Sequence, residues 1–85
     1  MSQQMYIAVE FDLARGERTG RIMEFLATSM KDAAEQLVYT LNLKEGFRGR
    51  GWKISPSGRT VQRMTGDIGW HLATVAGLAG RLLRG

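Results

Sequence analysis

The stretch Met5-Tyr6-Ile7-Ala8-Val9-Glu10-Phe11 decides the fold predicted from this sequence. Its side chains alternate: one face of an extended chain carries Met5, Ile7, Val9 and Phe11, and the other carries Tyr6, Ala8 and Glu10. A period of two is typical of a β-strand with one buried side. We therefore take this segment as the first strand and work outward from it.

A hairpin and a helix are expected after this strand. Residues 14–20 are charged and contain two glycines, which predicts a hairpin loop, and residues 21–27 form the returning strand. Ser29 is placed to cap a helix, with Asp32 completing a capping box. Apolar residues then recur at helical spacing until about residue 43: Met30, Ala34, Leu37, Val38 and Leu41.

The second half predicts another hairpin and another helix. Residues 52–54 suit a short edge strand, the turn at 55–58 contains proline and ends in glycine, and residues 59–65 return. Asp67 then caps a final helix with the apolar stripe Ile68, Leu72, Val75, Ala79 and Leu82. The expected fold class is α+β, in the order ββαββα. It is a single domain of residues 1–85, a small antiparallel sheet of two hairpins with two helices packed on one face.

Composition narrows the class of protein. With 44% hydrophobic and 24% charged residues, the chain of 85 residues is expected to fold. It contains no cysteine and no basic-then-apolar leader, which predicts a protein of the reducing cytoplasm. Its longest weakly polar stretch, residues 68–80, is shorter than the ~20 residues of a membrane span, so no transmembrane segment is expected.

Charge is distributed unevenly along the chain. Residues 1–45 carry five basic and seven acidic side chains, whereas residues 46–85 carry seven basic side chains and the single acid Asp67. No carboxylate occurs between Glu45 and Asp67. This asymmetry indicates either a surface for nucleic acid, a nucleoprotein or an acidic protein, or a solvated face that aids solubility.

Catalytic chemistry has little support. His71 is the only histidine, and the eight acids are scattered without the spacing of a calcium loop. Nucleophile elbows, phosphate-binding lysine loops and dinucleotide fingerprints are missing from the sequence. We therefore expect a protein that is not an enzyme and that has no metal site and no cofactor.

The strongest candidate for function is the segment at 46–53, with the sequence GFRGRGWK. Glycines let backbone amides approach an anion, arginines donate paired hydrogen bonds, and aromatic rings can stack on bases. Alternatively, the glycines only turn the chain, and the two rings cap the core. If both hairpins lie in one sheet, Arg21 and Arg59 are expected to face the same way and extend the basic patch; the alternative is that residues 15–21 are an ordinary exposed loop tip. The candidate partner-binding residues are Phe47, Arg48, Arg50, Trp52, Lys53, Arg59, Arg63 and Arg21.

The expected last helix also carries small residues at four-residue spacing: Gly69, Ala73 and Gly77. Such a row allows close approach to another surface. Three explanations remain open: packing onto the sheet, a homodimer seam of helix against helix, or contact with a membrane surface beside Arg81 and Arg84.

The layout of residues 5–43, with Ala27-Thr28-Ser29 leading into Asp32-Ala33-Ala34, resembles small phage-encoded anti-defence proteins, anti-CRISPR proteins included. The resemblance implies a small α+β domain in the host cytoplasm that inhibits a host complex by binding it, and it carries over no binding residues. Two functions are therefore expected as alternatives. One is an inhibitor that binds a host protein or nucleoprotein complex through a basic surface. The other is a general DNA- or RNA-binding protein that contacts phosphates through the Arg/Gly loop.

Overall fold

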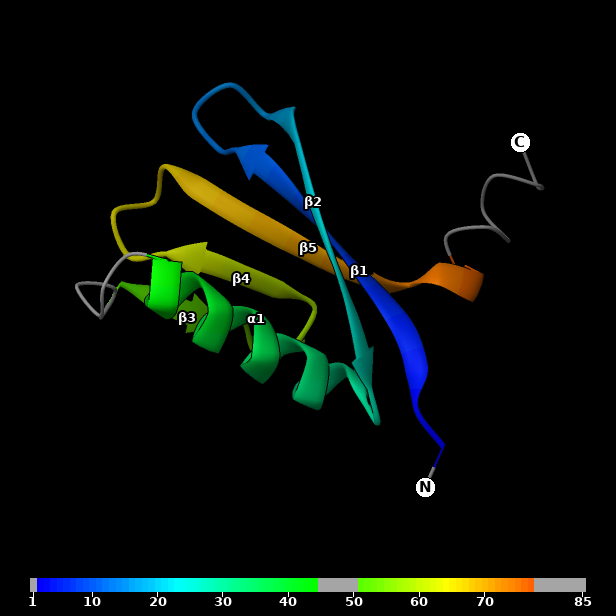
Figure 1. Ribbon diagram of the computed structural model, residues 1–85. Helices are drawn as coiled ribbons and strands as arrows, with labels where there is room; N and C mark the ends of the chain where they lie inside the picture. Colours follow the sequence, from blue (N-terminus) through cyan, green and yellow to red (C-terminus); the bar gives the residue numbers. More distant parts are fainter. Residues whose placement is uncertain (1, 45–50, 78–85) are drawn as a thin grey trace.

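The computed structural model describes residues 2–44 and 51–77, in which five strands and one main helix follow one another in the order ββαβββ (Figure 1). The first half contains β1, β2 and α1. The second half contains three strands, followed by one helical turn at residues 75–77. The bounds are β1 Gln4–Asp12, β2 Glu17–Ala27, α1 Met30–Lys44, β3 Trp52–Ile54, β4 Thr60–Arg63 and β5 Ile68–Thr74.

The five strands form one antiparallel sheet in the order β2-β1-β5-β4-β3. β1 pairs with β2 through a hairpin and, on its other edge, with β5, so that Val9 lies opposite His71. The first and last strands of the described chain are therefore neighbours near the middle of the sheet (Figure 1). This pairing joins the two halves of the molecule into one sheet.

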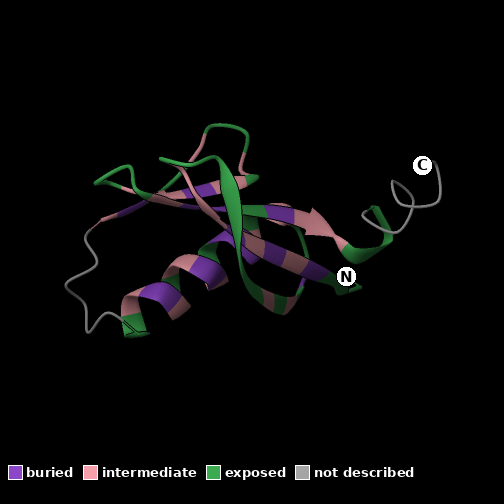
Figure 2. Ribbon diagram, turned by 90° about the horizontal axis from the view of Figure 1, so that it is seen from above, coloured by how far each residue is buried: buried purple, intermediate pink, exposed green. Residues whose placement is uncertain are grey.

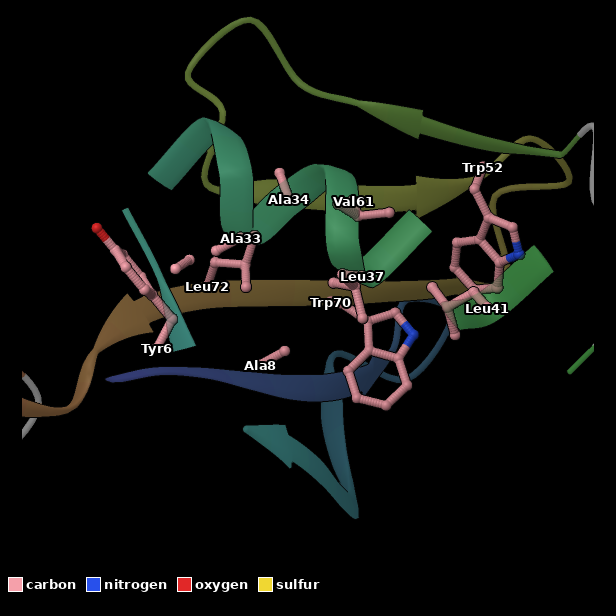
Figure 3. Packing of buried hydrophobic residues seen from close by; sticks show 11 residues of the cluster. Tyr6, Ala8, Ala33, Ala34, Leu37, Leu41, Trp52, Val61, Trp70 and Leu72 are labelled. Carbon is pink, nitrogen blue, oxygen red and sulfur yellow. The ribbon is translucent and has the colours of Figure 1, made fainter. Parts of the chain in front are cut away.

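The helix α1 covers one face of the sheet (Figure 2). Leu37 is fully buried at the centre, and its side chain lies against Trp70 of β5 (Figure 3). Leu41 and Trp52 lie together at one end of the cluster, and Tyr6 lies at the other. Full burial of a Leu or Val side chain contributes about 1.5–3 kcal/mol, so this face is the main source of stability.

The N-terminus of α1 confirms the predicted cap. The amide of Asp32 donates to the hydroxyl of Ser29 at 3.1 Å. In return the carboxylate of Asp32 accepts from the backbone amide of Thr28 at 3.0 Å and from its hydroxyl at 3.3 Å. The Thr28 amide holds the pKa of Asp32 below its usual value, since it stabilises the ionised form. These bonds fix the path from β2 into the helix.

The predicted second helix is wrong, because residues 68–74 form the strand β5. Ile68 and Leu72, four apart, satisfy a helical stripe and a strand face equally well. The deciding residue is Trp70 between them, which is buried on the same face, while His71 is exposed. The order is therefore ββαβββ, and Gly69 and Ala73 belong to a strand, not to a helical seam. The rest of the expected helix, residues 78–85, lies outside the described residues.

The turn before β5 explains why Asp67 does not cap a helix. Gly66 has a φ of +77°, which is favourable only for glycine, and its amide donates to the carbonyl of Arg63 at 2.8 Å. The carboxylate of Asp67 instead accepts from the hydroxyl of Thr65 and pairs with Arg63 at 3.4 Å. The chain thus reverses into a hairpin at this point. The predicted turn at 55–58 is confirmed, with the Gly58 amide 2.9 Å from the Ser55 carbonyl.

The two faces of β1 are occupied in an unexpected way. Its covered face carries Tyr6, Ala8 and Glu10, all buried beneath α1. Its wholly apolar face carries Met5, Ile7, Val9 and Phe11, which are half-buried or exposed. We call the side of the sheet away from α1 the open face. Across residues 2–44 and 51–77, no long helix covers it.

Candidate binding surface

On the open face β1 is apolar, and β2 contributes Ile22 and Leu26 on either side of the exposed Glu24. Ile22 lies opposite Val9, and Leu26 lies opposite Met5, so these four side chains share this side of the sheet. Ile22 is 55% exposed and Leu26 is 54% exposed. Neighbouring large apolar side chains that remain in water mark an interaction site more often than single ones do. We call Met5, Val9, Ile22 and Leu26 the apolar patch.

A groove with a volume of about 550 Å³ adjoins the apolar patch. Ile7, Val9 and Phe11 of β1 line it, together with His71 of β5. It follows the junction of the two strands that are distant in sequence. Its lining also includes Leu72 and Met30, so the groove extends from the β1–β5 junction to the beginning of α1.

Two rings meet in this groove. The ring centroids of Phe11 and His71 are 4.7 Å apart, and the ring planes are inclined by 59°. Phe11 lies opposite Gly69, which has no side chain, so its ring meets the diagonal neighbour His71. An added Cβ at Gly69 would lie 3.1 Å from the Leu13 side chain. Gly69 thus allows Leu13 to cover the strand while the two rings meet.

Two arginines line the groove. Arg18 of β2 is opposite Phe11, and Arg59 directly precedes Thr60, which is opposite His71. Both arginines are exposed and line the groove. Among the lining residues that the structure describes, none is a carboxylate. Glu24, opposite Ile7, lies on the outer strand of the same face. The groove thus combines two cations with two rings.

A buried carboxylate lies on the opposite side of the sheet. β2 has extra residues between its partners of Val9 and Phe11, and this bulge brings Thr19 and Arg21 to Glu10. The Thr19 hydroxyl donates to Glu10 at 2.5 Å, and an Arg21 nitrogen lies 3.8 Å from it. The side chain of Glu10 is 8% exposed, whereas that of Arg21 is 74% exposed. The Arg21 guanidinium therefore lies toward the covered side of the sheet, near Glu10.

A second, smaller recess lies beside Glu10, near the C-terminal end of α1, with a volume of about 280 Å³. Lys44, Trp52, Arg63 and Trp70 line it. The Arg63 guanidinium lies 5.2 Å from the centroid of the Trp52 ring, a cation–π contact.

Arg63 also lies near the carboxylate of Asp67. The hydroxyl of Thr65, with a smaller effect of Arg63, holds the pKa of Asp67 below its usual value.

The candidate residues predicted from the sequence lie in different parts of the molecule. Phe47, Arg48 and Arg50 lie outside the described residues. Trp52 belongs to the core cluster. Lys53, opposite Gln62 on β3, is exposed on the open face.

The remaining predicted arginines lie on different sides of the molecule. Arg59 lines the groove of the open face, whereas Arg63 lines the recess of the covered side. Because Arg21 pairs with Glu10, it does not extend a single patch with Arg59. The role of these residues in binding a partner stays a prediction.

Several residues of the open face escaped the sequence analysis, above all Ile22, Phe11, Arg18 and His71. The signal for His71 was its alternation with Trp70 and Leu72, which indicates a strand. With that strand beside β1, His71 falls on the same side as Ile7 and Val9.

Two further findings apply to the described part of the chain. No group of three or more histidine and carboxylate side chains is placed to hold a metal ion within residues 2–44 and 51–77. In the same residues, no helix has the length and apolar character required to cross a membrane. Comparison of the chain with protein-family models, with curated proteins and with solved structures gives no match in any of the three.

Proposed function

We propose that this protein is a non-enzymatic inhibitor that binds a host protein or nucleoprotein complex with the open face of its sheet. The observation that carries the proposal is the apolar patch, where Ile22 and Leu26 are more than half exposed although they lie beside Val9 and Met5. The resemblance of residues 5–43 to phage-encoded anti-defence proteins supports the inhibitor class. The arginines that flank the groove support an acidic partner.

The physical reason is the cost of leaving apolar area in water. Each Å² of apolar surface removed from water stabilises a complex by roughly 25 cal/mol before the costs of association. The apolar patch contributes little to the folded monomer, since its largest side chains stay exposed. A partner that covers it gains this burial, and the arginines of the adjoining groove orient the partner.

The test is capture of a partner from a lysate of host cells. The wild-type protein is immobilised beside the double variant Ile22→Ser/Leu26→Ser and the control Tyr39→Ser. Tyr39 is 62% exposed, but it lies on α1. We expect the wild type and the control to retain the same partner and the double variant to lose it. Equal retention by all three would contradict the proposal, provided that far-UV circular dichroism shows all three folded.

A further inference from the structure

We infer that the groove of the open face binds single-stranded nucleic acid, with bases on Phe11 and His71 and phosphates on Arg18 and Arg59. This inference rests on the proposed function, because it assigns a partner chemistry to part of the same face. It moves the expected nucleic-acid contact from the Arg/Gly loop to the middle of the sheet.

The ring pair supplies the stacking surface. Phe11 and His71 are 4.7 Å apart on neighbouring strands, and His71 is exposed. Proteins that bind single strands without strong sequence preference use such rings, because every base has a flat face. Bases in a duplex already stack on one another and do not offer these faces. The occupant that fits is therefore a single strand of DNA or RNA.

The charges complete the match. Arg18 of β2 lies opposite Phe11 of β1, whereas His71 lies two residues farther along β5 than the partner of Phe11, and Arg59 directly precedes β4. With strands about 4.8 Å apart, β2 and β4 are three spacings, or roughly 14 Å, apart, and the four side chains follow a diagonal across this width that accommodates a few nucleotides. The described lining of the groove contains no carboxylate that would repel phosphates. An acidic peptide would pair with the arginines but would leave the rings without flat partners.

Polar side chains of the groove suit the same occupant. Thr60, opposite His71, lines it together with Ser57 and Thr74. The Ser57 hydroxyl already bonds to that of Ser55, and the Thr74 hydroxyl accepts from the Gly77 amide, but a hydroxyl can both donate and accept. Base edges and sugars require both kinds of contact. The groove thus combines flat rings, cations and hydroxyls within one surface.

The experiment is a titration of fluorescently labelled oligo(dT) and oligo(U) followed by fluorescence anisotropy, at low and at physiological salt. The wild type should bind both oligonucleotides, and an unlabelled duplex should compete poorly. Phe11→Leu and His71→Ala should each weaken binding about tenfold, because each removes a stacking ring. Arg18→Ala/Arg59→Ala should weaken binding and reduce the magnitude of the log–log salt slope by about 1.4, at about 0.7 per phosphate contact. Lys31→Ala, an exposed cation on α1, is the control.

Three results would overturn the inference. The first is no binding of either oligonucleotide at low salt. The second is equal weakening by Lys31→Ala and by the arginine variants, which would indicate general charge attraction. The third is a protein partner that depends on Arg18 and Arg59 while the oligonucleotides do not bind. If oligonucleotides fail but capture still requires Ile22 and Leu26, only the inference is lost. If that capture fails as well, the proposed function is lost with it.

Discussion

The two faces of β1 differ in burial, and the more hydrophobic face is the less buried one. The face beneath α1 contains Tyr6, Ala8 and the carboxylate of Glu10. The open face contains only apolar residues, namely Met5, Ile7, Val9 and Phe11. The covered face is nonetheless the core, because the buried stripe of α1 and the ring of Trp70 meet there. Burial therefore depends on which element packs over a strand, and the more apolar face remains available to a partner.

The covered face also tolerates its carboxylate because of local hydrogen bonding. Glu10 is buried but accepts from Thr19 and lies near Arg21, so its charge has partners. The open face shows the reverse arrangement, with apolar side chains in water and cations beside them. One side of the sheet thus stabilises the fold, and the other is the side that we propose binds a partner.

The strongest way to break this comparison is Leu37→Ala in the centre of the covered face. Leu37 is fully buried against Trp70, so its truncation should lower the free energy of unfolding by about 2–5 kcal/mol. Urea denaturation measures the loss. Tyr39→Ala on the same helix should stay within about 0.5 kcal/mol of wild type, because Tyr39 is mainly exposed. Equal losses would mean that α1 does not pack through Leu37.

Thr19→Val tests how the covered face holds its charge. Valine has nearly the shape of threonine but cannot donate to Glu10, which should lower the free energy of unfolding by about 1–3 kcal/mol. Thr65→Val is the matched control, since the Thr65 hydroxyl donates to the exposed carboxylate of Asp67. Thermal unfolding monitored by circular dichroism should rank Thr19→Val clearly below the control. The same melting temperature for both would contradict a role of burial.

Acid titration tests the cap that directs α1 onto the covered face. The pKa of Asp32 is lowered in the folded protein, chiefly by the Thr28 amide, so the folded state binds this proton less readily than the unfolded chain. The stabilisation is present above the unfolded pKa of about 4 and is lost as the pH falls through the lower folded pKa. Asp32→Asn should therefore narrow the difference in stability between pH 7 and pH 3. An unchanged difference in urea denaturation would exclude Asp32 as a source of acid sensitivity.

The smallest effect on stability is expected at the apolar patch. Ile22→Ser and Leu26→Ser should each change the free energy of unfolding by no more than about 0.5 kcal/mol, because both side chains are already half in water. Urea denaturation of the single variants checks this value. A loss as large as that of Leu37→Ala would show that the open face is part of the core, and the contrast between the faces would disappear.

Sequence patterns predicted the local structure better than the sheet. The strand around Ile7, the cap at Ser29 and the turn at 55–58 were predictable because neighbouring residues determine them. β5 was mistaken because Ile68 and Leu72 fit both periods. The covered face of β1 was not predictable, since it follows from pairing with a strand about 60 residues away.

The site was also hard to predict, because it depends on which distant strands pair. Lys53 and Arg59 were predicted as partner-binding residues, and the structure places both at the surface. The meeting of Phe11 with His71, and the position of Arg18 opposite Phe11, required the register of three strands. No pattern within a short window contains that register.

The central place of β5 has a consequence for how the chain acquires its structure. The β1–β2 hairpin and α1 can form early from local contacts, but Trp70 and the inner edge of β1 find each other only after the strand at 68–74 has been synthesised. Until then a nascent chain keeps the free edge of β1 and the apolar stripe of α1 without their native partners, a state that is prone to association with other chains. Synthesis that pauses before this strand should therefore leave the protein dependent on chaperones, whereas completion of β5 closes the sheet in one cooperative step.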